Sequence, residues 1–504
     1  MDKRKGLINV IVSISFKLLT TVAVIIVRKL LIEYCGNEVN GLNALYLSIV
    51  GFLAIAELGV GSAITFCMYK PIVEQENDKV SALYHLFRKL YMIIGGIILI
   101  AGLSITPFIH FFANDYTLID ENLYLTFVLM LLSVVLTYVF SSKTSLINAY
   151  KNNYITTAIT SGGLLFQYVL QIIVLIMTHS FVGYLVCRIV AVLYQWILTD
   201  IITKRKYEFI IKKKNARIDS ETQKLLFKNI KAMFMHKIGT LLVNTIDSVI
   251  ISAFLGVVIL GKYSNYITIM VSVTAVLKLC FSSLTSVIGH MYVEEDLIKS
   301  RKYCETFHRV NFIIGLVFFL GYYAIIDNII YILFSPDLVV SKSISFVIAL
   351  NEFIQFLRQS VVTFREATGT FYYDRWKPLI EGIFNVIFSI ILVNIIGVVG
   401  VIVATILTNL LICHIIEPYV LYKNAFLSSP KKYYIKNYGM IILFFISLIL
   451  LNYLMIDFEN VWKELFVNGI ISVIIAIVAS SLALLFDKEM RRNLIETVKL
   501  RFFR

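Results

Sequence analysis

Several basic residues fall inside long apolar stretches of this 504-residue chain, where charge is costly. Lys17 and Arg28 are eleven residues apart, close to three helical turns, so both should lie on one face of a helix. Lys237, Lys278 and Arg358 fall in later apolar stretches. A cation inside a membrane helix costs about 2.5–3.5 kcal/mol on insertion scales and usually faces protein or a watery cavity. Ammonium and guanidinium groups placed there suit a phosphate-bearing ligand.

Two of the acidic residues in the apolar stretches, Glu57 and Asp247, are further candidates for function. Glu57 is followed closely by Gly59 and Gly61, and Asp247 lies on a polar stripe that begins at Lys237. Both acids are candidates for H⁺ or Na⁺ coupling. Asp247 as an ion-pair partner of Lys237 is the alternative, but ten residues separate them, about 15 Å along one helix. A direct pair within that helix is therefore excluded.

Other intramembrane cations have a simpler interpretation. Arg28 lies near one end of its apolar stretch and could instead extend to the lipid headgroups, and the same behaviour is expected of Lys143. The six cysteines are scattered without a CxxC pair, and the histidines near the apolar stretches are isolated. The sequence therefore predicts no metal, no cofactor beyond a coupling ion, and no catalytic residue.

The composition predicts that these residues lie in membrane-spanning helices. Hydrophobic residues make up 59% of the chain and charged residues only 15%, which excludes a soluble enzyme, a disordered chain and a disulfide scaffold. An all-α polytopic membrane protein fits, with no nucleic-acid partner. Apolar runs predict fourteen spans: 8–32, 43–68, 90–112, 123–146, 156–178, 181–203, 234–255, 263–290, 309–327, 342–364, 377–396, 398–421, 437–456 and 466–486.

The basic residues predict the orientation of these spans. With the N-terminus inside, the inner connections carry most Lys and Arg, whereas the outer loops carry only Lys262, Lys342 and Lys463. Both termini are therefore expected in the cytoplasm. The most basic connection, 204–233, is expected to form an amphipathic segment on the inner membrane surface. It is interpreted as a topology signal attracted to anionic lipid, and a docking site for a cytoplasmic partner is the alternative.

A repeat at an offset of 220 residues divides the chain. The offset superimposes Lys17 on Lys237, Gly36 on Gly256, Gly41 on Gly261 and Tyr46 on Tyr266. An offset of six spans gives both copies the same orientation, as in transporters built from parallel repeats. We expect an N-lobe at 1–203, the linker at 204–233, a C-lobe at 234–421, two extra helices at 422–486 and a basic tail at 487–504. Spans 1, 2, 7 and 8 would line a cationic cavity between the lobes.

Three groups of motifs resemble one transporter family. They are residues 28–42 with 57–61; residues 244–248 with 254–256 and 261–266; and residues 365–369 with 374–381 and Asn385. On these motifs the chain resembles the polysaccharide-transport flippases of the multidrug/oligosaccharidyl-lipid/polysaccharide exporter (MOP) superfamily. The resemblance implies two six-helix lobes and alternating access.

The resemblance also implies a cargo and a cellular setting. The cargo would be an undecaprenyl-diphosphate-linked oligosaccharide, flipped across the bacterial cytoplasmic membrane for capsule, exopolysaccharide or O-antigen-type synthesis. Polysaccharide polymerase and assembly proteins are implied partners. In the related lipid II flippases, cavity arginines hold the diphosphate, whereas Lys17, Lys237 and Lys278 would do so here, assisted by Arg28 and Arg358. Lysine contacts phosphate as a point charge and lacks the arginine fork.

Two other functions remain as alternatives. A drug/cation antiporter would suit an acidic cavity, which the deep lysines oppose. A membrane polymerase or ligase of lipid-linked glycans would need a sizeable loop outside the membrane, and the predicted outer loops are short.

Overall fold

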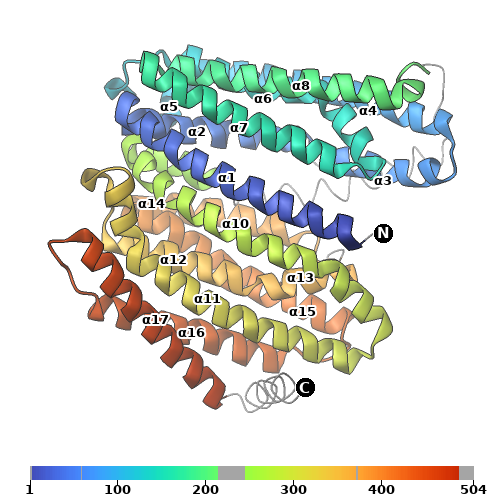
Figure 1. The fold of residues 1–504 in the computed structure, drawn as a ribbon. Helices are drawn as coiled ribbons and strands as arrows, with labels where there is room; N and C mark the ends of the chain where they lie inside the picture. The colour runs from blue at the N-terminus through green and yellow to red at the C-terminus, as the bar shows by residue number, and fades with distance from the viewer. Residues whose placement is uncertain (1–2, 58–59, 214–244, 371–372, 487–504) are drawn as a thin grey trace. The chain divides into compact units, whose positions relative to one another are not determined.

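The computed structural model describes residues 3–57, 60–213, 245–370 and 373–486 (Figure 1). Helices make up nearly all of these ranges, and no strand occurs within them. Nine of the described helices are long and apolar enough to cross a membrane. Each predicted span overlaps helix within the described residues, although only 245–255 of the seventh can be assessed. The prediction of an all-α polytopic membrane protein is confirmed.

The first compact unit contains residues 1–264 and 378–383. Its helices are α1 (Lys3–Cys35), α2 (Asn37–Leu53), α3 (Val60–Val73), α4 (Asn77–Ile105), α5 (Ile109–Phe112), α6 (Leu123–Ala149), α7 (Asn153–Thr178), α8 (Phe181–Ile211), the helix Thr245–Leu255 and the first turns of α10 (Val257–Glu294). Short 3-10 helices occur at Ala54–Glu57 (η1), Thr106–Phe108 and Tyr116–Leu118.

The second unit contains residues 265–377 and 384–504. After the rest of α10 come α11 (Leu297–Leu333), the 3-10 turn Pro336–Leu338, α12 (Lys342–Leu357), α13 (Gln359–Thr368), α14 (Lys377–Thr408), the π-helical turn η6 (Asn409–Cys413), α15 (His414–Asn424), α16 (Lys431–Leu454) and α17 (Val461–Phe486). The predicted lobe boundaries stay predictions. Most of the 204–233 linker and the 487–504 tail lie outside the described residues.

The predicted second span, 43–68, is not one continuous helix. α2 ends at Leu53, the 3-10 turn η1 covers Ala54–Glu57, and α3 begins at Val60. Gly59 and Gly61 weaken helix propagation here. A break inside a membrane helix is tolerated where protein or a cavity can satisfy the backbone groups that it releases. The break places the candidate Glu57 at the end of a short turn.

α14 reverses direction at Ile396–Gly397, so it contains two antiparallel segments. Gly397 has φ 62° and ψ −138°, a conformation that favours glycine. The amide of Asn385 donates to Thr405 Oγ1 over 2.9 Å, although twenty residues of straight helix would span about 30 Å. The predicted boundary between the eleventh and twelfth spans, at 396–398, is therefore confirmed.

The 220-residue repeat has structural counterparts. Gly36 and Gly256, with φ 90° and 95°, each separate one helix from the next. Tyr46 and Tyr266 are both fully buried. Tyr46 Oη donates to Leu123 O over 2.9 Å, and Tyr266 Oη donates to Asp327 Oδ1 over 2.7 Å. Equivalent positions therefore share a backbone conformation or burial in the two copies.

Candidate functional site

The three lysines predicted to bind phosphate cannot be assessed at their side chains. Lys17 lies on α1 and Lys278 on α10, but both side chains lie outside the described residues, as does all of Lys237. Their phosphate-binding role stays a prediction, and so does the cavity between the lobes.

Arg28, on α1, contacts the start of α10 within the first unit. Its Nη1 donates to Ser264 Oγ over 2.9 Å, and Ser264 in turn donates to Gly261 O over 2.9 Å. Asn40 on α2 also donates to Gly261 O, over 3.2 Å. Arg28 therefore engages a neighbouring helix near repeat-related positions. Its guanidinium group has five N–H donors in all.

Glu57 lies at the break between α2 and α3. Its Oε1 accepts a hydrogen bond of 2.7 Å from Tyr91 Oη on α4, and Tyr91 is 2% exposed. A Cβ on Gly61 would lie only 2.5 Å from that same hydroxyl. Gly61 therefore leaves the space through which Tyr91 reaches Glu57. The arrangement holds one carboxylate at a helix break, which suits binding of a proton or a small cation.

Asp247, the second predicted coupling residue, lies in the helix Thr245–Leu255 and is half-buried. A Cβ on Gly51 of α2 would lie 3.4 Å from the Thr245 methyl group. Thr245 therefore packs against α2. The coupling role of Asp247 stays a prediction.

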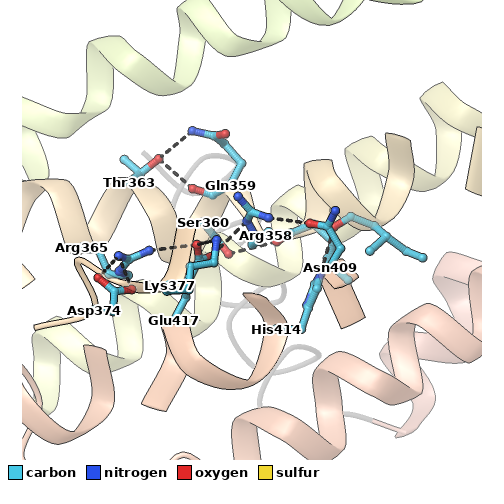
Figure 2. A network of polar contacts seen from close by, with 12 residues as sticks. Arg358, Gln359, Ser360, Thr363, Arg365, Asp374, Lys377, Asn409, His414 and Glu417 are labelled. Atoms are coloured by element: carbon cyan, nitrogen blue, oxygen red, sulfur yellow. Dashed lines mark hydrogen bonds and ion pairs between the residues drawn. The ribbon is translucent and has the colours of Figure 1, made fainter. Parts of the chain in front are cut away.

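A buried ion network joins the helices of the second unit (Figure 2). Glu417 on α15 is its centre, with a side chain that is 3% exposed. Glu417 accepts from Lys377 Nζ over 2.9 Å, from Arg365 Nη1 over 3.0 Å and from Arg358 Nε over 3.1 Å. Arg365 also pairs with the buried Asp374. The five groups carry three positive and two negative charges.

A π-helical turn allows Asn409 and Glu417 to contact the same arginine, Arg358. Asn409 begins η6 and accepts a hydrogen bond from Arg358 Nη1. His414, just after η6, contacts Ile354 O over 3.1 Å and Asn437 over 3.0 Å. Because a π turn inserts an extra residue, it shifts the helix faces on either side. Asn409 and Glu417 can thereby both contact Arg358.

The structure changes the interpretation of Arg358. A predicted phosphate ligand, it is 22% exposed and already contacts Glu417 and Asn409. Its first role in this structure is to link α12, α13 and α15. A contribution to phosphate binding stays a prediction. Lys143, which was expected to extend to the headgroups, instead pairs with Asp200 on α8; Asp200 also pairs with Lys204 over 2.7 Å.

Sequence reasoning missed Glu417 and Tyr91. Glu417 is an acid within the predicted span 398–421, so its cost inside a membrane was a sufficient signal of a buried partner. Its partners Arg365 and Lys377 belong to the third family-like motif. Tyr91 carries no such signal, because a tyrosine in an apolar helix is ordinary. The ranges that can be described contain no group of three His, Cys, Asp or Glu that could hold a metal.

Comparisons with known proteins give matches in structure. No protein-family model matches the sequence, and no curated protein matches it. The lipid II flippase MurJ in its inward closed conformation matches with a TM-score of 0.65 at 13% identity, over 96% of this chain and 100% of that chain. An inward-facing multidrug resistance MATE transporter matches with a TM-score of 0.66 at 14% identity, over 82% of this chain and 98% of that chain.

A third match is a MOP superfamily transporter from Pyrococcus furiosus, described as having a binding pocket of reversed polarity that suggests a different function. Its TM-score is 0.54 at 14% identity, over 84% of this chain and 95% of that chain. These matched structures are a flippase and transporters, not enzymes. The chain therefore has the fold shared by the lipid II flippase and the MOP superfamily transporters that it matches.

Proposed function

We propose that this protein flips undecaprenyl-diphosphate-linked oligosaccharide repeat units across the cytoplasmic membrane by alternating access. The observation that supports this most is the extent of the match to the lipid II flippase, 96% of this chain against 82% for the MATE transporter. The likeness to a protein that flips a lipid-linked cargo thus extends over nearly the whole chain.

The charge of the apolar stretches favours the same class of cargo. Three lysines are expected at membrane depth: Lys17, Lys237 and Lys278. Their positive charge suits a diphosphate cargo and opposes an organic cation. Arg28 adds a guanidinium group near Ser264. Polysaccharide synthesis, cytoplasmic termini, and a polymerase and assembly proteins as partners belong to this proposal. The structural matches do not support a drug/cation antiporter better than they support a flippase.

Coupling to H⁺ or Na⁺ belongs to the same proposal. Glu57 supports it best, because its carboxylate lies at a helix break and accepts a hydrogen bond from the Tyr91 hydroxyl. Helix breaks near the membrane midplane often hold the coupling ion in transporters. Asp247 would be the second coupling group.

The cargo is tested with the full-length protein in liposomes. We expect a fluorescent undecaprenyl-diphosphate oligosaccharide in the inner leaflet to become accessible at the outer leaflet, and an organic cation dye not to be transported. A deletion strain should accumulate single repeat units inside the cell. Transport of the dye without movement of the lipid would favour the antiporter. Accumulation of single repeat units outside the cell would favour a polymerase.

A further inference from the structure

A basic cavity of about 400 Å³ opens in the second unit, and none of the five residues of the ion network around Glu417 lines it. It is bounded by α11, the end of α15 and the start of α16. Five basic residues line it, with Glu305 as the one acid among the described lining residues: Arg301, Arg309, Lys431, Lys432 and Lys436. Arg309 is only 4% exposed, so part of this charge lies deep. Such a cavity favours an anion.

Two polar atoms in the cavity wall have no hydrogen-bond partner among the described residues. They are Tyr422 Oη and His308 Nε2, and each of these residues is 2% exposed. Burying a hydroxyl or an imidazole nitrogen without a partner is unfavourable. Both residues line the cavity. A ligand with an acceptor oxygen would satisfy the tyrosine hydroxyl.

Aromatic rings and a hydrogen bond pack closely around these two atoms. The ring of Tyr433 lies 4.8 Å from that of His308 and 5.6 Å from that of Tyr422, measured between centroids. His308 Nδ1 is held by Ser360 Oγ at 2.8 Å. Because Ser360 Oγ donates to Leu357 O, Nδ1 carries the hydrogen that bonds Ser360, and Nε2 is an acceptor. The cavity then offers one neutral donor, Tyr422 Oη, beside several cations.

We propose that this cavity binds a phosphoryl group, supplied by the headgroup of an anionic membrane phospholipid. A phosphate oxygen would accept from Tyr422, and Arg301, Arg309 and the lysines would balance its charge. The basic ends of α11 and α16 support the lipid source, because the charge pattern places them at the inner leaflet, where anionic lipids attract such residues. Free phosphate has the same chemistry and is the other source to be tested.

The test measures thermal melting of the full-length protein in uncharged detergent while one phosphate compound is titrated. The compounds are dioleoyl phosphatidic acid, dioleoyl phosphatidylcholine, glycerol 3-phosphate and inorganic phosphate. We expect a saturable rise in Tm with phosphatidic acid alone. A saturable rise with inorganic phosphate or glycerol 3-phosphate at similar concentrations would overturn the lipid source and keep the phosphoryl site.

Two variants locate the effect. Tyr422→Phe removes only the hydroxyl without a partner, so the Tm without lipid should stay the same or rise, while phosphatidic acid should bind about tenfold more weakly. The double variant Lys431→Gln, Lys432→Gln should also weaken binding. The matched control is Lys302→Gln, Lys423→Gln, which removes two exposed lysines outside the cavity. Equal binding by Tyr422→Phe and wild type would overturn the proposal, as would equal losses in the two lysine pairs.

Discussion

Gly41 and Gly261, which the 220-residue repeat makes equivalent, pack against each other's helix in a reciprocal way. A Cβ on Gly41 would lie 1.9 Å from the carbonyl oxygen of Val257, and a Cβ on Gly261 would lie 2.5 Å from that of Asn37. Val257 and Asn37 are themselves repeat-equivalent. The first turns of α2 and α10 therefore cross at a contact with local two-fold symmetry, where only glycine fits.

Gly41→Ala should lower the Tm of the purified protein, because backbone atoms would have to separate at this crossing. Overpacking of this kind typically costs about 1–3 kcal/mol. Gly261→Ala should act in the same direction, and the double variant should cost less than the sum of the two because both strain one contact.

Gly162→Ala on α7 is the matched control, since nothing lies within 4 Å of its Cβ position. Alanine there should leave the Tm unchanged or raise it slightly, as expected in a helix. Equal Tm values for Gly41→Ala and Gly162→Ala would show that the crossing is not tightly packed.

Glu57→Gln should remove the dependence of flipping on a pH or Na⁺ gradient across the liposome membrane. The substitution keeps the size of the side chain and removes its charge. Gly61→Ala should weaken the same dependence, because the added methyl group would displace the Tyr91 hydroxyl from Glu57.

Glu76→Gln serves as the control for this acid, because Glu76 forms an exposed pair with Lys79. It should retain the wild-type gradient dependence. The coupling role of Glu57 is wrong if Glu57→Gln responds to both gradients as the wild type does, or if the wild type responds to neither.

Glu417→Gln should strongly destabilise the second unit, because three cations would lose their shared carboxylate. Removing one partner of a buried ion pair typically costs about 3–5 kcal/mol. Thermal melting should therefore show a large fall in Tm. Asp457→Asn is the control, since its pair with Lys342 is exposed and such pairs are worth about 1 kcal/mol or less.

Arg358→Gln separates a structural role from a ligand role at that residue. If Arg358 acts mainly through Glu417 and Asn409, Tm and flipping rate should fall together. A normal Tm with a flipping rate reduced about tenfold or more would instead identify Arg358 as a phosphate ligand.

The sequence predicted the number and order of the spans because apolar runs about 20 residues long leave few alternatives. The boundary between spans 377–396 and 398–421 is also predicted from the apolar runs, and the repeat makes Gly36 equivalent to Gly256. The break before α3 was not predicted, since residues 43–68 read as one apolar run.

The partners of the intramembrane charges were harder to predict than the charges themselves. Arg358 was identified, but its contact with Glu417 depends on a π-helical turn that no local residue pattern signals. Tyr91 reaches Glu57 from another helix through the space left by Gly61. Such pairs are set by how helices pack, and periodicity along one segment does not contain that information.

The most direct test of the central claim is the initial rate at which the Lys17→Ala, Lys237→Ala double variant flips a labelled undecaprenyl-diphosphate oligosaccharide in liposomes. The variant should be reconstituted in the same amount and orientation as the wild type, with Lys29→Ala, Lys262→Ala as the matched double control. We predict a fall of about tenfold or more in the double variant, from the loss of two charge-assisted phosphate contacts, and a nearly unchanged rate in the control. A wild-type rate in the double variant would contradict the account.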